Sequence, residues 1–485
     1  MAVTKADLHR IGEYLWEIPT SFRSDMRVPA RIYASERLLD QIFRDKSLEQ
    51  LVNTAAMPGV VKWVLVMPDA HQGYGPPIGG VVPTRYPDGV ISPGAVGYDI
   101  NCGVRLLASD LMADEVRGAT SDLISALYHN IPSGLGSEDK GRKVVGRDMD
   151  EVLVKGAAWA VKAGYGRRED LERLEEGGAM PGADPSAVSP RAKQRGSTQL
   201  GTLGSGNHFI EIQQVTDIYD EEVARVFGLF LGQLVVLIHS GSRGLGHQVC
   251  DEYVRDLQAA VRKYNIQLPD RELVCAPLDS PEGQKYFGAM ASAANYAWAN
   301  RQFMTQLARR SFEQVLAGKV KSMDLHVVYD VAHNIAKIEE HVVDGKRVKL
   351  CVHRKGATRA FGPGHPAVAP VYRAVGQPVL VPGDMGTASY VLVGTADALE
   401  ESFGTCCHGA GRTMSRAAAK KQIYGTELRH RLEAQGIQVR AGSMSGLAEE
   451  APEAYKDIEA VVEVVDGAGL ARRVARMRPL AVMKG

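Results

Sequence analysis

The segment Tyr98-Asp99-Ile100-Asn101-Cys102-Gly103-Val104-Arg105 places a carboxylate and a thiol three residues apart, within a turn framed by glycines. Such a turn lets Asp99 and Cys102 reach one metal ion, and a thiolate has enough lone pairs to bridge two ions. Cys102 alone would more often be a small buried apolar residue, because free cysteine is among the most buried residue types. The neighbouring carboxylate favours a metal site.

Three histidines stand where apolar, β-branched or glycine-rich runs end, as side chains at strand ends do. They are His208 after Gly204-Ser205-Gly206-Asn207, His239 after Val235-Val236-Leu237-Ile238, and His333 after Val327-Val328-Tyr329-Asp330-Val331-Ala332. A thiolate, a carboxylate and imidazoles suit a borderline divalent transition ion better than calcium or magnesium alone. Each histidine taken singly could instead be a satisfied strand-end residue.

Length and composition indicate a large soluble globular protein. The 485 residues could form two or three ordinary domains or one large mixed α/β domain, and the 45% apolar content allows a substantial core. Lys plus Arg number 57, as do Asp plus Glu, so an anionic partner would have to be met by a local basic surface. The charge balance weakens a nucleic-acid interpretation without excluding it.

The cysteines and the N-terminus indicate the cytoplasm. The six cysteines contain no CxxC pair, which argues against a disulfide scaffold and a four-cysteine zinc site. Residues 1–19 carry charges throughout and resemble no signal peptide, and no later window approaches the length of a membrane span. We therefore expect a cytoplasmic protein without a membrane partner.

Hydrophobic periodicity predicts alternating helices and strands. Helices are expected at residues 4–16, 32–54, 113–130, 149–163, 247–264 and 282–317. Strands are expected at 60–66 and 209–213, before His239 and before His333, with a hairpin at Asp344-Gly345 and a strand pair at 379–381 and 390–393. Because the candidate ligands are scattered from 99 to 333, we expect one integrated domain over residues 1–485.

Two further segments have unusual composition. From Pro68 to Cys102, glycines recur so often that the backbone must turn tightly or approach something closely, which is typical of a site. Residues 167–196 are dense in Arg, Glu, Gly and Pro and resemble a mobile polar insertion on the surface.

A second constellation runs from Cys406 to Arg416. His408 precedes a small-residue loop that is expected to open a helix, where free backbone amides form an anion site. Arg412, Arg416 and Lys420 fall at i, i+4 and i+8, so they would share one helical face that could meet phosphates. A solvated basic face and a packed glycine turn would explain the same residues.

Two absent motifs narrow the nucleotide chemistry. No GxxxxGK[ST] segment is present, which argues against a P-loop enzyme, and no lysine begins a Lys-x-Asp-Gly run. If a nucleotidyl group is carried covalently, histidine is therefore the better candidate nucleophile.

Six motifs together resemble those of the RtcB family of RNA-splicing ligases. They are Asp99-Ile100-Asn101-Cys102-Gly103-Val104-Arg105, Gly204-Ser205-Gly206-Asn207-His208-Phe209, His239-Ser240-Gly241-Ser242-Arg243-Gly244, Ala332-His333-Asn334, His353-Arg354-Lys355-Gly356-Ala357-Thr358-Arg359 and Cys407-His408-Gly409-Ala410-Gly411-Arg412. The resemblance covers nearly the whole chain. It implies an α+β fold, a single compact domain of unusual topology with a central metal-binding cleft.

The resemblance also implies a mechanism. One manganese ion would be held by Cys102, His208 and His239, and a second by Asp99, Cys102 and His333. His408 would attack the α-phosphorus of GTP and carry GMP covalently, then pass it to an RNA 3′-phosphate. A 5′-hydroxyl end would displace GMP from this RNA-3′-ppG intermediate, and a 2′,3′-cyclic phosphate would first be hydrolysed. The expected role is tRNA splicing or RNA repair, in some members with the activating protein archease.

The same resemblance assigns the contacts to GTP and RNA. Those to GTP are Asn207, Glu211, Asn334, Ser389, His408, Gly409, Ala410, Gly411, Tyr455 and Lys484. A carboxylate can accept from guanine N1 and N2, and a lysine can donate to O6. The candidate RNA phosphate contacts are Arg195, Arg243, Arg412 and Arg416. For each arginine a surface ion pair is the competing explanation.

Two other functions fit the same residues. A dinuclear metallohydrolase, such as a cyclic phosphodiesterase, would use the ligand cluster to activate water but would leave His408 without a role. A non-catalytic RNA-binding protein could hold a purely structural metal. Structural zinc sites usually have four protein ligands, however, whereas each site expected here has three.

Overall fold

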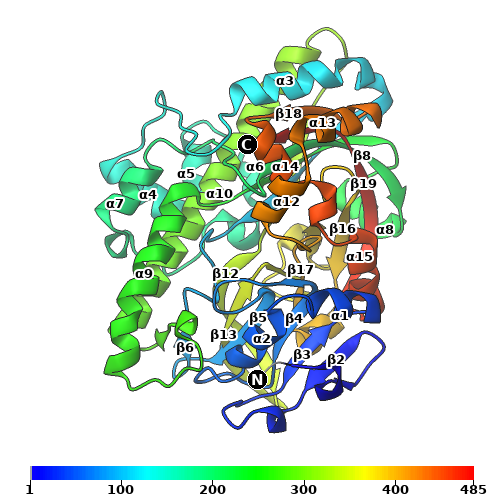
Figure 1. Ribbon diagram of the computed structural model, residues 1–485. Coiled ribbons are helices and arrows are strands. Elements are labelled where there is room, and N and C mark those ends of the chain that lie inside the picture. Colours follow the sequence, from blue (N-terminus) through cyan, green and yellow to red (C-terminus); the bar gives the residue numbers. More distant parts are fainter. Residues whose placement is uncertain (1–2) are drawn as a thin grey trace.

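Two large β-sheets organise residues 3–485, the part of the chain that the computed structural model describes (Figure 1). The seven-stranded sheet has the order β1 (His9–Arg10), β2 (Leu15–Ile18), β3 (Ala30–Tyr33), β4 (Val64–His71), β5 (Ile78–Arg85), β13 (Lys346–Lys355) and β12 (Asn334–Val343). The eight-stranded sheet has the order β11 (Leu325–Ala332), β7 (Gly103–Met112), β9 (Gln233–Ser240), β8 (Phe209–Ile218), β19 (Ala471–Lys484), β16 (Ser389–Gly394) and β15 (Pro378–Val381), and β18 (Gln438–Ala441) joins it beside β19.

Two small ribbons complete the β-structure. β14 (Ala357–Arg359) pairs with β17 (Thr405–Cys407), and β6 (Val90–Ile91) pairs with β10 (Ala276–Pro277). Most pairings are antiparallel, but β3 with β4 and β18 with β19 are parallel. The sheets are therefore mixed, and the expected α+β class is confirmed.

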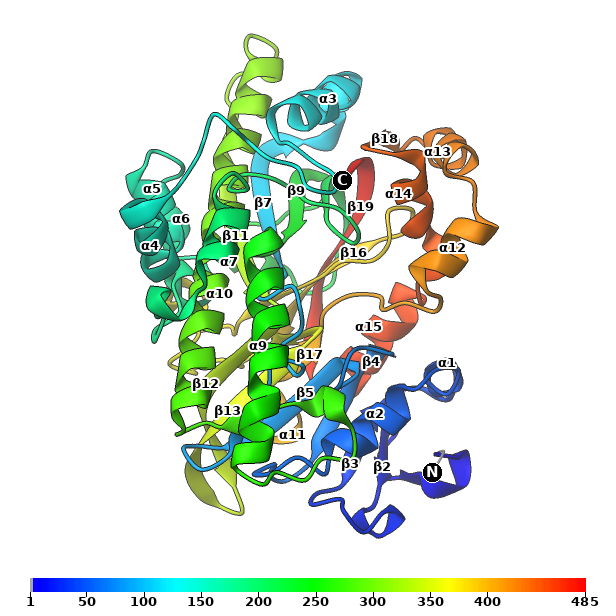
Figure 2. The same cartoon turned by 60° about the vertical axis from the view of Figure 1, so that its left-hand side comes forward.

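The helices surround the sheets. They are α1 (Glu36–Ile42), α2 (Ser47–Thr54), α3 (Thr120–Asn130), α4 (Gly146–Lys155), α5 (Ala157–Lys162), α6 (Arg168–Leu171), α7 (Pro190–Gly196), α8 (Glu221–Phe227), α9 (Arg243–Lys263), α10 (Pro281–Leu316), α11 (Ala396–Glu401), α12 (Arg416–Gln422), α13 (Gly425–Ala434), α14 (Met444–Glu449) and α15 (Ile458–Gly467). Figure 2 shows α9 and α10 as long green helices on one side, with α12 and α14 on the other. None of the helices in residues 3–485 combines the length and the apolar character that a membrane span requires.

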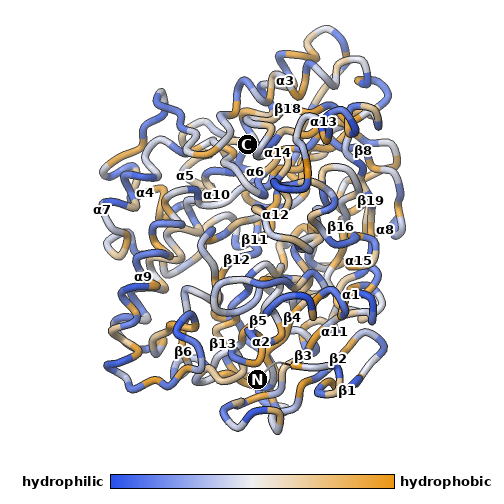
Figure 3. Tube along the Cα trace, in the orientation of Figure 1, coloured by the Kyte–Doolittle hydropathy of each residue, from blue (hydrophilic) through white to orange (hydrophobic). Residues whose placement is uncertain are grey.

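The core lies on both faces of the eight-stranded sheet. Leu107, Ile210 and Val236 face one hydrophobic cluster with α10, whereas Leu106 and Val235 face another on the opposite side. Polar and apolar segments alternate along α9, as expected of a helix with one buried face (Figure 3). α10 is buried along most of its length and packs against one face of the eight-stranded sheet.

Long elements were predicted well. The helices expected at 247–264 and 282–317 are α9 and α10, and those at 113–130 and 149–163 correspond to a 3₁₀ turn followed by α3 and to α4 with α5. The Asp344-Gly345 hairpin joins β12 and β13, with Val343 paired to Lys346. The strand pair at 379–381 and 390–393 is β15 with β16.

The N-terminal helices were predicted wrongly. Residues 4–16 form a 3₁₀ turn and the strand β1 and enter β2, and residues 32–54 divide into the end of β3 and the helices α1 and α2. The strand expected at 60–66 begins only at Val64 and runs on to His71. Sheet pairing explains the error at β2, because its register with β3 overrides the local helical pattern.

Residues 167–196 fold against the body of the protein as short helices, including α6 and α7. Within this segment the carboxylates of Asp170 and Glu175 are buried and pair with Arg309 and Lys337. The mobility expected for this segment stays a prediction, but its attachment is not that of a loose surface loop.

Candidate functional site

The candidate metal ligands lie at one edge of the eight-stranded sheet. In the order β11-β7-β9-β8 each strand runs antiparallel to the next, so strand ends and strand starts alternate along that edge. Cys102 immediately precedes β7, His208 precedes β8, His239 is the last residue but one of β9, and His333 follows β11. Strand-end placement therefore brings together residues that are far apart in the sequence.

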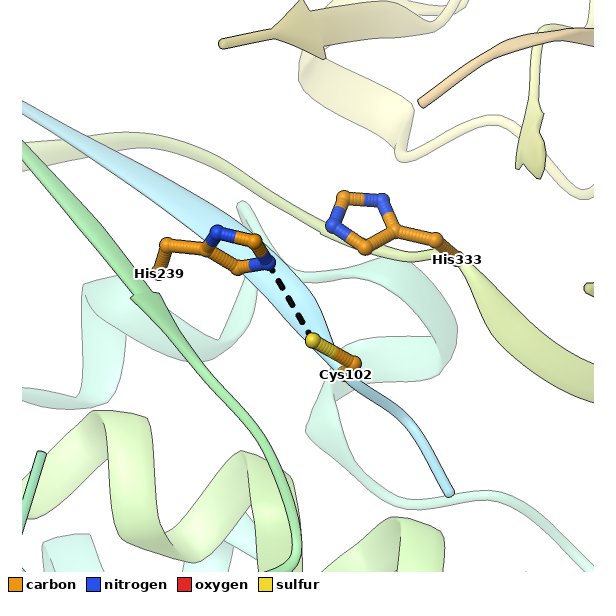
Figure 4. Close-up of side chains that lie close together, drawn as sticks. All are labelled: Cys102, His239 and His333. Atoms are coloured by element: carbon orange, nitrogen blue, oxygen red, sulfur yellow. Dashed lines mark hydrogen bonds between the residues drawn. The ribbon is translucent and has the colours of Figure 1, made fainter. Parts of the chain in front are cut away.

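Their ligand atoms form a compact cluster. Cys102 Sγ lies 3.2 Å from His239 Nε2 (Figure 4) and 3.6 Å from His208 Nε2. His208 Nε2 lies 2.8 Å from Asp99 Oδ2. Two groups result, Cys102 with His239 and His333, and Asp99 with Cys102 and His208, and within each group the ligand atoms lie within 4.8 Å of one another. Cys102 belongs to both groups, as a bridging thiolate would.

This grouping differs from the one that the family resemblance implies. In the structure His208 stands with Asp99 and His333 stands with His239, whereas the resemblance exchanges the two histidines. The shared role of Cys102 is the same in both arrangements. The assignment of each histidine to a particular ion stays a prediction.

Hydrogen bonds orient two of the imidazoles. His208 Nδ1 lies 3.0 Å from the Leu203 carbonyl oxygen, and His333 Nδ1 lies 3.2 Å from Thr358 Oγ1. His333 Nε2 is buried and has no hydrogen-bond partner among the residues that the structure describes. A buried nitrogen without a partner is unfavourable unless a ligand satisfies it. A hydrogen bond at the other ring nitrogen, as at Nδ1 of His208 and His333, is common in metal-binding histidines. These residues therefore fit a divalent transition metal.

Burial controls protonation in the cluster. Burial raises the pKa of the Cys102 thiol well above its usual range, and the Asp99 carboxylate adds to the effect. Burial also holds the pKa values of His239 and His333 far below the usual range. For Asp99, burial acts to raise the pKa, but the His208 imidazole lowers it below its ordinary value. The imidazoles of His239 and His333 are therefore neutral. The Cys102 thiol would lose its proton when it binds a metal ion.

His408 reaches the same region from a different sheet. It follows β17, and its Nδ1 lies 2.6 Å from Asp69 Oδ2 in β4. The same oxygen accepts from the backbone N–H groups of His408 and Gly409, at 3.0 and 3.3 Å. Because the carboxylate occupies Nδ1, Nε2 is the nitrogen left for chemistry. The ring centroids of His408 and His333 are 5.4 Å apart, so this nitrogen belongs to the neighbourhood of the cluster.

The buried Asp69 carboxyl is held in its ionised form. Burial acts to raise its pKa, but the imidazole of His408 and the ammonium of Lys456 together bring it below the ordinary value. Lys456 donates to the carbonyl oxygen of Pro68 at 3.0 Å, next to Asp69 in the chain. A charged acceptor thus faces His408 Nδ1.

The loop after His408 does not open a helix directly, so the helical face expected to carry Arg412 together with Arg416 and Lys420 is wrong for Arg412. The anion site stays a prediction. α12 begins only at Arg416, and Arg412 lies outside it. The loop instead passes against β4: Gly411 has φ +71°, and a Cβ there would lie 2.1 Å from the Asp69 carbonyl oxygen. Only glycine fits this approach.

The residues assigned to guanine come from adjacent strands. Glu211 lies in β8 opposite Val482, and Lys484 lies two residues further along β19. Glu211 Oε2 accepts from Gln213 Nε2 at 2.6 Å, and burial raises the pKa of Glu211 to about 8. Ser389 is buried, and its Oγ accepts a hydrogen bond from Gln213 Nε2 at 3.1 Å.

Tyr455 and Lys484 share a buried carboxylate. The Tyr455 hydroxyl donates to Glu450, and Lys484 Nζ lies 4.0 Å from the same side chain. Glu450 also pairs with Arg412 and Arg416, each at 3.2 Å. An ion pair was the competing explanation for each candidate RNA contact, and such a pair is present at both Arg412 and Arg416.

Among residues 3–485, no carboxylate forms an ion pair with either of the other two arginines. Arg243 is 8% exposed and donates to the hydroxyl groups of Thr202 and Ser137, at 3.1 and 3.0 Å. Its φ of +54° is strained for a residue with a side chain. Arg195 donates to the amide oxygen of Gln248 at 3.0 Å. Both guanidinium groups keep charge that an anionic ligand could meet.

One cavity of about 1070 Å³ joins these groups. Of the candidate site residues named from the sequence, Ser389 and Lys420 do not line it. Those that do are Asp99, Cys102, His208, His239, His333, His408, Asn207, Glu211, Asn334, Gly409, Ala410, Gly411, Tyr455, Lys484, Arg195, Arg243, Arg412 and Arg416. The cavity therefore joins the metal-ligating cluster, His408 and the polar residues around Glu211 and Lys484.

Sequence reasoning missed Asp69, Gln213 and Glu450, which hold the side chains it found. Asp69 carried a usable signal, because it stands in Pro68-Asp69-Ala70-His71 at the end of a strand and before a glycine-rich loop. Gln213 and Glu450 carried none, since a buried glutamine in a strand and a glutamate at a helix end are ordinary in any sequence.

Comparison with known proteins identifies relatives over nearly the full chain. A family model described as "tRNA-splicing ligase RtcB" matches residues 50–485. Proteins named tRNA-splicing ligase RtcB are 58% identical over 479 residues in Thermococcus kodakarensis and 55% identical over 478 residues in Archaeoglobus fulgidus, in both cases covering 99% of this chain and 99% of the relative. The protein of that name from Methanococcus maripaludis is 50% identical over 481 residues, covering 99% of this chain and 100% of the relative.

The fold and the site together define a mixed α/β protein with a thiolate-centred metal-ligating cluster in a deep polar cavity. The chain belongs to the RtcB family.

Proposed function

We propose that this protein is a GTP- and manganese-dependent RNA ligase that joins RNA 3′-phosphate or 2′,3′-cyclic phosphate ends to 5′-hydroxyl ends. The observation that carries the proposal is the pair His408 and Asp69. The carboxylate fixes His408 Nδ1 at 2.6 Å, which leaves Nε2 as the candidate nucleophile beside the metal-ligating cluster.

His408 performs the first step. Its Nε2 attacks the α-phosphorus of GTP, an N–P bond forms, the bond from that phosphorus to the bridging oxygen breaks, and pyrophosphate leaves. Asp69 stabilises the positive charge that develops on the imidazole ring, as the carboxylate of a catalytic triad does. Asn207 and the small residues Gly409, Ala410 and Gly411 leave room for the phosphate next to the ring.

Two manganese ions, held by Asp99, Cys102, His208, His239 and His333, would neutralise phosphate charge and orient the displacement. A soft thiolate with imidazoles and one carboxylate is the donor set that supports this assignment. Asn334 Nδ2 donates to the Asp99 carbonyl oxygen at 3.0 Å, so it stabilises the turn that carries two of the ligands.

Transfer to RNA follows from the same adduct. An oxygen of the RNA 3′-phosphate attacks the phosphorus on His408, the P–N bond breaks, and an RNA-3′-ppG end forms. The 5′-hydroxyl of the second RNA then attacks the 3′-phosphorus, GMP leaves, and a phosphodiester remains. Arg195 and Arg243 are the arginines best placed for RNA phosphates, since neither guanidinium is paired with Glu450 as Arg412 and Arg416 are.

Guanine would be selected by Glu211 and Lys484. The carboxylate accepts from N1 and N2, the ammonium donates to O6, and adenine presents the opposite polarity at these positions. Gln213 bridges Glu211 and Ser389, so Ser389 supports the pocket from behind. Tyr455 offers its ring as a stacking face at the cavity wall.

The biological setting belongs to the same proposal. Joining such ends serves tRNA splicing or RNA repair, archease is the candidate activating partner, and the cytoplasm is the expected compartment. All six cysteines are free thiols, which suits a reducing environment.

The test uses the native protein with α-labelled GTP and manganese, followed by RNA with a 3′-phosphate and RNA with a 5′-hydroxyl. We expect an acid-labile labelled adduct, joined RNA, and loss of both with His408→Ala. Joined RNA without any adduct would contradict the proposal. Full turnover of cyclic phosphate without ligation, unaffected by His408→Ala, would instead support the metallohydrolase alternative.

A further inference from the structure

Three aromatic rings form a row along one wall of the cavity. Tyr74 and Tyr98 have ring centroids 5.7 Å apart at 75°, and Tyr98 and His247 have centroids 6.1 Å apart at 34°. All three line the cavity, and His247 belongs to α9, across the molecule from α12 and α14 (Figure 2). The proposed guanine pocket uses Tyr455, so this aromatic wall is separate from it.

The loop that carries Tyr74 is held rigidly. Gln50 bonds both backbone groups of Gly73, accepting from its N–H at 3.0 Å and donating to its carbonyl oxygen at 2.7 Å. Glu272 accepts from the N–H of Gly75 at 2.9 Å, and a Cβ at Gly75 would lie 2.6 Å from the Glu272 carbonyl oxygen. These contacts hold the backbone on both sides of Tyr74 in place.

A buried lysine completes this support. Lys355 Nζ donates to the carbonyl oxygen of Pro76 at 2.8 Å and also to that of Tyr74. Burial lowers the pKa of this ammonium to about 7. Burying such a group is unfavourable unless hydrogen bonds compensate, as the two carbonyl oxygens do here. These hydrogen bonds fix the backbone at Tyr74, so the point from which its ring extends is set before any ligand binds.

The rings are not an ordinary part of the core. Tyr74 and Tyr98 pack against the core with part of their surface and are only half-buried, and His247 is exposed. Tyr98 immediately precedes the candidate ligand Asp99, and His247 lies one helical turn after Arg243. The aromatic wall therefore adjoins both the metal-ligating cluster and the buried guanidinium of Arg243, which donates to hydroxyl groups.

We propose that this aromatic wall, formed by Tyr74, Tyr98 and His247, stacks an unpaired nucleobase at the end of the RNA whose phosphate or hydroxyl group reacts at the cluster. The inference rests on the proposed ligase function. Stacking on tyrosine and histidine is the usual way in which proteins hold single-stranded RNA, and it accepts every base because every base has a flat face. The subsite would position an RNA end without selecting its sequence.

The test measures binding of a short single-stranded RNA that carries 2-aminopurine at its 3′-phosphorylated end or, in a second RNA, at its 5′-hydroxyl end. We expect the fluorescence of at least one of them to be quenched on binding to the native protein. Replacing that terminal base by an abasic residue should weaken binding about tenfold. Tyr74→Leu and His247→Leu should weaken binding of the intact RNA by a similar factor and leave binding of the abasic RNA as it was.

Matched variants separate stacking from misfolding. Tyr74→Phe keeps the ring and should retain native affinity, and Tyr424→Leu, at a tyrosine that is 75% exposed away from the cavity, should change nothing. Equal affinity of the native protein for intact and abasic RNA would overturn the inference, and so would the absence of quenching at both ends.

The native protein also separates this inference from the proposed function. If it forms the labelled GTP adduct and joins RNA but does not distinguish abasic RNA, only the aromatic wall is refuted. If it forms no adduct and joins no RNA, the proposed function fails, and this inference fails with it.

Discussion

Asp69 shows how one buried carboxylate orients a histidine side chain and the loop that carries it. A single oxygen accepts from the His408 ring and from two backbone N–H groups, so both the ring orientation and the loop are fixed by one atom. We expect Asp69→Asn to slow formation of the GMP adduct by about 100-fold or more, because the amide can donate to Nδ1 and favour the wrong tautomer. The rate of labelling at saturating GTP is the measurement.

Metal binding serves as the control for that variant, since Asp69 is not a candidate ligand. Cobalt absorption should be the same in Asp69→Asn and in the native protein. An unchanged labelling rate in the variant would show that His408 does not depend on Asp69.

The raised pKa of Glu211 predicts that nucleotide binding depends on pH. Burial raises its pKa to about 8, so the free protein carries the neutral acid below that pH. Guanine needs the carboxylate as an acceptor, so binding must release a proton, and affinity for GTP should rise as the pH increases from 6 to 8. Calorimetry in two buffers of different ionisation enthalpy measures the release. A variant Glu211→Gln with the same proton release would contradict the assignment.

At the scale of the element, α10 is joined to the edge of the sheet through Asp330 of β11. Its buried carboxylate accepts from Arg105 at 2.8 Å and from Arg301 at 2.7 Å. Arg301 also donates to the carbonyl oxygens of Asn101 and Ser240, both at 2.9 Å, which adjoin Cys102 and His239. Arg301 of this helix thereby fixes the backbone next to two candidate ligands.

Removing that carboxylate should be strongly destabilising. Asp330→Asn leaves two buried guanidinium groups poorly compensated, and we expect a loss of about 3–5 kcal/mol in the free energy of unfolding, measured with denaturant. The matched control is Asp114→Asn, which breaks the exposed pair with Arg117 and should change stability by less than about 1 kcal/mol. Equal effects of the two substitutions would refute the role of the buried network.

At the scale of the whole molecule, the candidate ligands tie together four neighbouring strands and the turn before β7. Manganese at 100 times its dissociation constant should therefore stabilise the folded protein by about 2.7 kcal/mol, and a chelator should reverse the gain. Magnesium should stabilise less, because it binds thiolate and imidazole poorly. Thermal unfolding with each ion is the measurement, and a native-like gain in Cys102→Ala would contradict the metal site.

The sequence was informative where chemistry is local. His239 and His333 could be placed at strand ends because apolar runs stop beside them, and His208 because a glycine-rich run stops there and a strand begins. Antiparallel order then puts these strand ends and strand starts at one edge. It failed at residues 4–16, where pairing of β2 with β3 decides the conformation. Such pairing depends on a partner strand that the local pattern does not contain.

The amino-acid sequence by itself determined the set of reactive groups: one thiol, one carboxylate and three imidazoles at the ends of strands, with His408 before a glycine loop. Only the tertiary structure decided what holds and surrounds them, including Asp69 behind His408, Arg301 behind the ligand turn, and the aromatic wall. The physical reason is that the nature of a functional group belongs to its residue, whereas its orientation, burial and protonation depend on neighbours that lie hundreds of residues away.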